Sequence, residues 1–154
     1  MAETAARFGK HPIHPTLVVL PLGLWVAALA FDIVAVATGN LVWCTVAFWN
    51  IVAGIIGALI AAVPGFIDYL TLDGRAGRLA TYHMCLNLGA VAVFALNWYV
   101  RTRVPPESWW PLALSIVGVL GVTGSGWLGG ELVYVERVGV QEESRTEDRY
   151  RRAA

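Results

Sequence analysis

Charged residues are scarce in this sequence. Of its 154 residues, 14% are charged and 57% are hydrophobic, whereas a soluble domain usually has about 25% charged residues. A chain with so few polar side chains cannot cover the surface of a soluble core, and its length corresponds to one domain. The formal net charge is zero and the basic residues of the C-terminal segment alternate with acidic ones, so no nucleic-acid partner is expected.

Cysteine and enzyme motifs are also nearly absent. Cys44 and Cys85 form no Cys-x-x-Cys pair, which argues against an iron–sulfur cluster or thiolate metal site. The topology below places them near opposite membrane faces, so they cannot come within the roughly 7 Å that a disulfide requires between Cα atoms. Because the chain lacks Gly-x-Ser-x-Gly, a phosphate-binding glycine loop with lysine, and His-Glu-x-x-His, no enzyme class is indicated.

Long apolar runs are what the sequence has instead. A helix needs about 20 apolar residues to cross a bilayer core, and only helices satisfy their own backbone over such lengths in lipid. The period-2 alternation of a membrane barrel is missing. The sequence therefore predicts an all-α membrane protein, a four-transmembrane-helix bundle with spans at about 15–37, 42–70, 79–100 and 109–134.

Polar segments separate these spans and flank them. We expect an N-terminal segment over 1–13, the transmembrane domain over 14–135, and a charged tail over 136–154 that buries too little apolar surface to fold alone. Ala28-Leu29-Ala30 resembles a signal-peptidase site, but the apolar run continues to Ala37, so we expect a retained helix. No internal repeat is apparent.

Two prolines and the basic residues add detail to this topology. Pro21 and Pro64 lie inside spans and predict local bends. With four spans, the N-terminus, the 72–78 loop and the C-terminal tail share one side, which carries nine Lys and Arg residues against two on the other. Cytoplasmic loops are enriched in Lys and Arg, so both termini are expected in the cytoplasm of a bacterium, with the protein a multi-pass protein of the inner membrane.

Each of the four predicted helices carries one ionisable side chain near its cytoplasmic end. Such groups inside a span are costly, and they are candidates for function. Two structural interpretations stay open beside a binding site: a ring that reaches water, or a network that joins His83 to a carboxylate. The four residues are His14, Asp68, His83 and Glu131.

Two binding chemistries fit this cluster. The neutral imidazoles of His14 and His83 are suited to axial ligation of a b-type haem iron. Together with Asp68 and Glu131, the same histidines form a mixed nitrogen and oxygen set for zinc or iron. The sequence leaves both open.

Small and polar neighbours complete the expected site. Asn87, one turn from His83, is expected to orient a ligand by hydrogen bonding. Gly126, Gly129 and Gly130 are expected to make room for a flat group against the fourth helix, or to pack against another helix.

Structural roles are expected for the other polar residues. Asp32 is expected to pair with Arg101 or to bond Asn97, while Asn50 and Asn97 are expected to donate hydrogen bonds between helices. His11 lies outside the span and is expected to be solvated.

Four motifs in order resemble a known family. They are His11-Pro12-Ile13-His14-Pro15 with Leu20-Pro21-Leu22-Gly23, Gly65-Phe66-Ile67-Asp68-Tyr69, His83 with Asn87, and Trp127-Leu128-Gly129-Gly130-Glu131-Leu132-Val133-Tyr134 followed by Gly139-Val140. Over about residues 11–140 the chain resembles the bacterial membrane family called domain of unknown function 2231.

The resemblance implies a redox setting, because relatives are sometimes joined to Rieske-type iron–sulfur or cytochrome modules. In many relatives the position that matches Glu131 is histidine, so His14 and His83 are the imidazoles that remain here. No redox module is apparent in this chain, and a redox partner is therefore expected to be a separate protein.

Together these patterns predict a small inner-membrane protein with a haem b or metal site near the cytoplasmic face, acting in electron transfer. The alternative is a non-catalytic membrane subunit or scaffold that packs against other membrane helices. The lipid bilayer and a second copy of the chain are the other partners considered.

The orientation is testable with a reporter fused after Ala154 and a tag inserted near Pro105. We expect a cytoplasmic signal from the reporter and labelling of the tag from outside, because of the uneven Lys and Arg distribution. A reporter on the outer side would reject the orientation.

Overall fold

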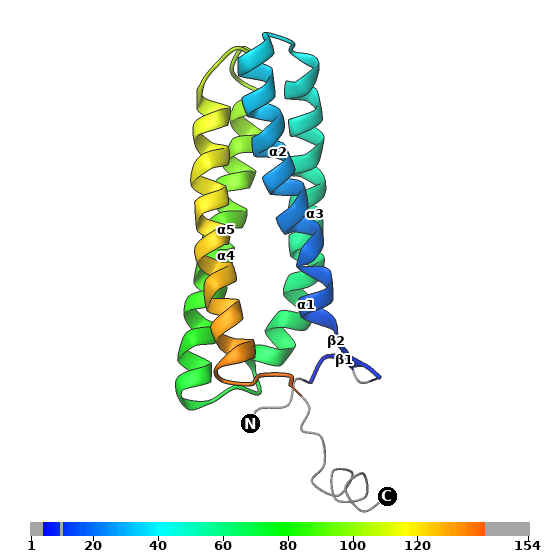
Figure 1. Cartoon of the computed structure of the whole chain (residues 1–154), viewed down its shortest axis with the longest axis vertical. Helices are drawn as coiled ribbons and strands as arrows, with labels where there is room; N and C mark the ends of the chain where they lie inside the picture. Colours follow the sequence, from blue (N-terminus) through cyan, green and yellow to red (C-terminus); the bar gives the residue numbers. More distant parts are fainter. Residues whose placement is uncertain (1–4, 10, 141–154) are drawn as a thin grey trace, which may run out of the picture.

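The computed structural model describes residues 5–9 and 11–140. Two short antiparallel strands come first, β1 (Arg7–Phe8) and β2 (His11–Pro12). The helices then run up and down as an elongated bundle, with both described ends of the chain at the same end of it (Figure 1). They are α1 (Ile13–Leu17), α2 (Val19–Thr38), α3 (Val42–Tyr69), α4 (Gly74–Arg101) and α5 (Trp110–Tyr134).

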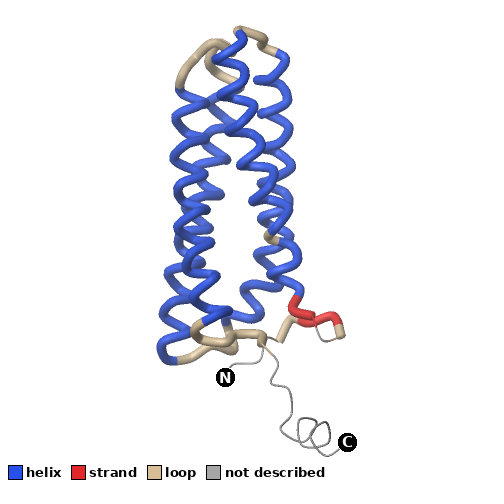
Figure 2. Tube along the Cα trace, in the orientation of Figure 1, coloured by secondary structure: helices blue, strands red, loops and turns tan. Residues whose placement is uncertain are grey.

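The four predicted spans are confirmed as helices that are long and apolar enough to cross a membrane, with α1 and α2 together forming the first. Figure 2 shows short loops at both ends of the bundle. The first predicted span is interrupted at Val18, between α1 and α2, close to the predicted bend. Pro21 has no N–H to donate to the carbonyl of Leu17, which accounts for the interruption. The third helix, in contrast, continues through Pro64. The α4 helix begins at Gly74, five residues before the predicted span. Its first residues come from the polar segment that was expected to be a loop, so the helix extends beyond the apolar run.

The bundle consists of two helical hairpins, α1/α2 with α3 and α4 with α5, and contacts within each hairpin are more extensive than contacts between them. In the first hairpin Trp25 lies against Gly54, and in the second Phe94 lies against Gly118. A Cβ atom on either glycine would come within 2.6 Å of a ring atom. The two rings then stack on each other between the hairpins, with centroids 4.2 Å apart.

Equivalent residues of the two hairpins have the same spacing in the sequence along most of the length of the helices. Trp25 lies eleven residues after His14, as Phe94 lies eleven after His83. Three glycines of the second helix of each hairpin have the same spacing, and they are Gly54, Gly57 and Gly65 in α3 and Gly118, Gly121 and Gly129 in α5. The expectation that the chain has no internal repeat is therefore wrong at the level of structure.

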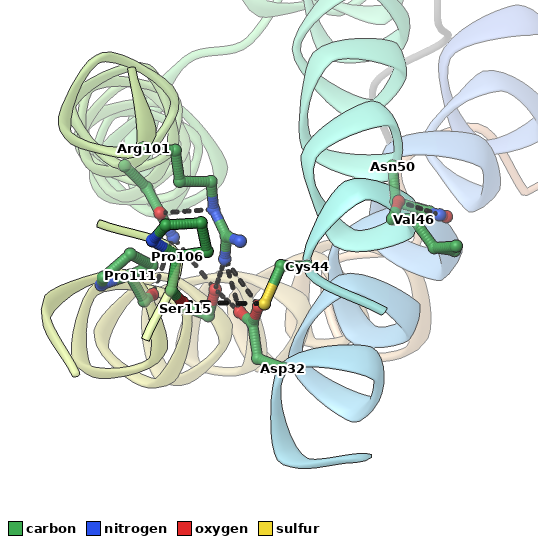
Figure 3. Close-up of polar contacts among 9 residues, drawn as sticks. Asp32, Cys44, Val46, Asn50, Arg101, Pro106, Pro111 and Ser115 are labelled. Carbon is green, nitrogen blue, oxygen red and sulfur yellow. Dashed lines mark hydrogen bonds and ion pairs between the residues drawn. The ribbon is translucent and has the colours of Figure 1, made fainter. Parts of the chain in front are cut away.

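A buried polar network joins the hairpins at the end opposite the described termini, here called the arginine end (Figure 3). Nη2 of Arg101 donates to Oδ1 and Oδ2 of Asp32 at 2.7 and 2.6 Å. Ser115 donates to Oδ2 of Asp32 at 2.6 Å, and Asn97 accepts from Nε of Arg101 at 3.0 Å. The ion pair is thus supported by further hydrogen bonds, as a buried pair requires.

This network confirms two predictions and corrects a third. Asp32 pairs with Arg101, and Asn97 donates between helices to Ser115 at 2.9 Å. Asn50 does not bond across helices: its amide donates to the carbonyl of Val46 in its own helix, at 2.9 Å (Figure 3). That bond satisfies the amide locally, so no partner on another helix is needed.

The ring-on-glycine contacts can be tested by adding one methyl group. Gly54→Ala and Gly118→Ala should each destabilise the bundle by about 1–3 kcal/mol, because buried, stacked rings cannot move aside. Gly89→Ala in α4 is the matched control, since nothing lies within 4 Å of its Cβ position, and alanine there should favour the helix by up to about 1 kcal/mol. Reversible denaturant unfolding in detergent measures all three. Equal stability of the three variants would contradict the packing described.

Candidate functional site

The imidazole rings of His14 and His83 face each other across the two hairpins. Their centroids lie 6.3 Å apart and their planes are perpendicular, at 89°. One ring comes from α1 and the other from α4, at the end of the bundle that carries the described termini, here called the histidine end. The structure therefore brings together the two predicted histidines.

The His14 ring is fixed by the kinked part of the first hairpin. Its Nδ1 lies 2.9 Å from the carbonyl oxygen of Ala61, and a Cβ atom at Gly65 would lie 2.6 Å from the same nitrogen. A carbonyl oxygen only accepts hydrogen bonds, so Nδ1 carries the proton and Nε2 keeps its lone pair. Glycine at position 65 is what lets the ring lie this close to α3.

The His83 ring has the corresponding environment in the second hairpin. Its Nδ1 lies 2.8 Å from the carbonyl oxygen of Ser125 and 3.0 Å from the hydroxyl of the same residue. A Cβ atom at Gly129 would lie 3.2 Å from Cε1 of the ring. Here too the carbonyl assigns the proton to Nδ1, so that each hairpin presents an imidazole with an Nε2 lone pair.

Asn87 lies at the other nitrogen of His83. Its Nδ2 is 3.0 Å from Nε2 of the ring and 3.0 Å from the carbonyl oxygen of His83. Ser125 thus holds Nδ1, while Asn87 covers Nε2, the nitrogen that a metal would take; the orienting role of Asn87 stays a prediction. Val18, four residues after His14, is the equivalent of Asn87, four residues after His83. A side chain that hydrogen-bonds Nε2 is therefore present in the second hairpin but not at the equivalent position of the first.

The carboxylate of Asp68 is hydrogen-bonded to the N-terminal segment. Its Oδ1 accepts the backbone N–H of Ala6 at 2.8 Å, and the carbonyl of Ala6 in turn accepts the N–H of Ile13 at 3.1 Å. This buried carboxylate thus fixes the segment that precedes α1, including the strands β1 and β2. Sequence reasoning missed this role because the donor is a backbone group, which carries no residue signature.

Glu131 lies on the surface of the histidine end. It pairs with Arg75 at 3.1 Å, and Arg75 also pairs with Glu136 at 3.2 Å. Exposed pairs of this kind contribute about 0–1 kcal/mol. The ring of His83 bonds Ser125 and Asn87, so the alternative in which a network joins His83 to a carboxylate is not what the structure shows.

The small residues of α5 divide into two groups. Gly129 lies against the ring of His83. Gly130 has only Tyr134 of its own helix near its Cβ position, at 3.9 Å, and Gly126 has nothing within 4 Å. Of the three glycines, only Gly129 therefore borders the histidine pair.

The number of protein ligands at the histidine pair distinguishes the two predicted kinds of site, one for a metal ion and one for a haem. Among residues 5–9 and 11–140, no group of three or more His, Cys, Asp and Glu side chains is placed to hold a metal ion. Zinc takes three or four protein ligands, so the set of His14, His83, Asp68 and Glu131 is not gathered for it. A haem iron needs only two axial ligands from the protein, and the two imidazoles match that number.

The spacing of the rings also fits one ion between them. A metal–imidazole bond is about 2.0–2.1 Å long, so His14 and His83, whose ring centroids lie 6.3 Å apart, are near enough to each other that they would together hold one ion. Asn87 has to release Nε2 of His83 before a ligand can bind there.

The fold and this site define a four-helix membrane protein with a histidine pair between two helical hairpins. Residues 10–142 match the family described as "Predicted membrane protein (DUF2231)", and the chain belongs to that family, as its motifs predicted. No match was found among the curated proteins or the solved structures. Membership confirms that the protein is a multi-pass membrane protein in contact with lipid.

Proposed function

We propose that this protein is an electron carrier in which His14 and His83 bind a b-type haem between the two hairpins. The single observation that carries the proposal is the facing pair of imidazoles, one from each hairpin, with centroids 6.3 Å apart. Haem, when bound, supplies one-electron chemistry at its iron. The chain supplies the axial nitrogens, their orientation and the apolar surroundings.

The hydrogen bonds at Nδ1 support this role. Ligating histidines almost always donate their other ring N–H to a carbonyl or carboxylate, which fixes the tautomer and raises the basicity of the ligand. Ala61 and Ser125 provide such carbonyl acceptors for His14 and His83. Both histidines are therefore held in the tautomer that metal ligation through Nε2 requires.

The interior beyond the histidines excludes water. The stacked rings of Trp25 and Phe94 are 3% and 0% exposed, and they close the space between the hairpins on the side of the arginine end. Apolar surroundings and solvent exclusion are among the factors by which a protein sets the reduction potential of a haem. This arrangement favours electron transfer over chemistry that needs an open coordination position.

The location and partners of the proposed carrier follow from the sequence. We place the histidine end on the cytoplasmic side of a bacterial inner membrane, because the Lys and Arg residues are concentrated there. A Rieske-type or cytochrome protein is the redox partner that the family resemblance implies. Zinc or non-haem iron at the same histidines, and a scaffold without cofactor, are the competing outcomes of the experiment below.

The test is an absorption spectrum, oxidised and reduced, of protein purified gently from its native membrane, with metal analysis on the same sample. We expect sharp α and β bands in the reduced protein. His14→Ala and His83→Ala should each remove them, because loss of a direct ligand costs more than the 10–100-fold typical of outer contacts. His11→Ala is the matched control and should keep the bands, since His11 is exposed on strand β2.

Two results would reject the haem. Wild-type protein with about one equivalent of zinc or iron and no haem bands would assign a metal to the pair instead. Wild-type protein with neither haem nor metal would reject the binding function altogether, and the scaffold would take its place.

A further inference from the structure

A cavity of about 240 Å³ lies at the arginine end, far from the histidine pair. It is lined by the facing ends of α2 and α4, the first turns of α3 and α5, and the loop between α4 and α5. One water occupies about 30 Å³ in the liquid, so this cavity has room for a small ring with substituents. Its walls contain the polar side chains of Asp32, Cys44, Arg101, Glu107 and Ser108.

Arg101 offers an unused donor at this cavity. Its side chain is 7% exposed, and its Nε and Nη2 donate to Asn97 and Asp32. Its Nη1 makes no hydrogen bond within the described part of the chain, and Figure 3 shows it pointing toward the side where Cys44 lies. Because none of the buried side-chain nitrogens and oxygens described lacks a partner, Nη1 is not fully buried, and the cavity that Arg101 lines is the open space beside it.

The charges around Nη1 of Arg101 favour a neutral ligand over an anion. The guanidinium of Arg101 is neutralised by Asp32, at 2.6 Å, and Glu107 adds a carboxylate to the cavity wall. An anion would therefore meet no net positive charge. A neutral acceptor such as a carbonyl oxygen can take the Nη1–H without adding a buried charge, which avoids the larger desolvation cost.

The position of the cavity points to a lipid-soluble ligand. It lies where α2 and α4 end and where α3 and α5 begin, and exposed tryptophans at the start of α5, Trp109 and Trp110, are typical of a membrane interface. Molecules that reach it include those dissolved in the bilayer. We propose that the cavity binds the carbonyl group of a neutral, lipid-soluble compound, either a quinone headgroup or the ester of a phospholipid, through Nη1 of Arg101. This binding does not depend on the haem.

Cys44 provides the assay, because its half-buried thiol lines the cavity. The Cys85→Ser protein retains Cys44 as its single thiol and is placed in nanodiscs of ether-linked phosphatidylcholine, which has no carbonyl. The rate of Cys44 alkylation by N-ethylmaleimide is then measured with and without decylubiquinone, whose fully substituted ring resists thiol addition. At about ten times its Kd, the quinone should slow alkylation about tenfold, because only the empty cavity reacts.

Ester-linked phosphatidylcholine distinguishes the two sources. Slow alkylation in ester lipid without quinone, and fast alkylation in ether lipid, would identify the lipid ester as the ligand. Protection by quinone in ether lipid identifies the quinone. Equal rates in ether lipid, ester lipid and ether lipid with quinone would overturn the proposal.

Arg101→Lys tests the donor itself, since lysine keeps the charge beside Asp32 but lacks Nη1. Protection should be lost in this variant and kept in the control Arg103→Lys, since Arg103 is exposed and does not line the cavity. Protection that persists in Arg101→Lys would overturn the role of the guanidinium. If Arg101→Lys does not fold, the comparison of lipids in the Cys85→Ser protein still decides whether the cavity binds a carbonyl compound.

Discussion

Close contact of aromatic rings with glycine is the constraint on which both halves of this bundle depend. Lipid tails solvate apolar side chains as well as a neighbouring helix does, so helices in a membrane are held by packing and hydrogen bonds. At Gly54 and Gly118 a ring occupies the space of a missing side chain, and at Gly65 and Gly129 an imidazole does so. The feature that packs each hairpin therefore also places its histidine.

Polar groups are paired differently at the two ends of the bundle. At the arginine end, charges are buried and joined across the hairpins, with Asp32 and Arg101 at matching positions of the repeat. At the histidine end, the two matching residues are imidazoles whose Nδ1 atoms are hydrogen-bonded to carbonyls within their own hairpins. Their Nε2 atoms remain the groups through which a ligand can join the halves. One end of the repeat thus carries a buried ion pair between the hairpins, and the other carries the histidine pair that we propose as a binding site.

Features set by length and charge could be predicted from the sequence. The four spans, the Asp32–Arg101 pair and the placement of both histidines at one end follow from apolar run length and from which end of a helix a residue occupies. Contacts between a side chain and the backbone could not be predicted, because any residue supplies a backbone N–H or carbonyl. For that reason Asp68 was expected beside the histidines, whereas it binds Ala6. The repeat was missed because its matching positions differ in residue type, although the glycine spacing of α3 and α5 is the same.

The central claim is that the two hairpins present paired imidazoles whose Nδ1 atoms are held by backbone carbonyls, so that Nε2 is the nitrogen that carries the lone pair. Nitrogen-15 NMR of the ligand-free protein, labelled at histidine and assigned with His14→Ala and His83→Ala, measures this directly near neutral pH. We predict that both rings carry their proton on Nδ1, held by the carbonyls of Ala61 and Ser125, and have an unprotonated Nε2. Protons on Nε2 of either ring would contradict the arrangement.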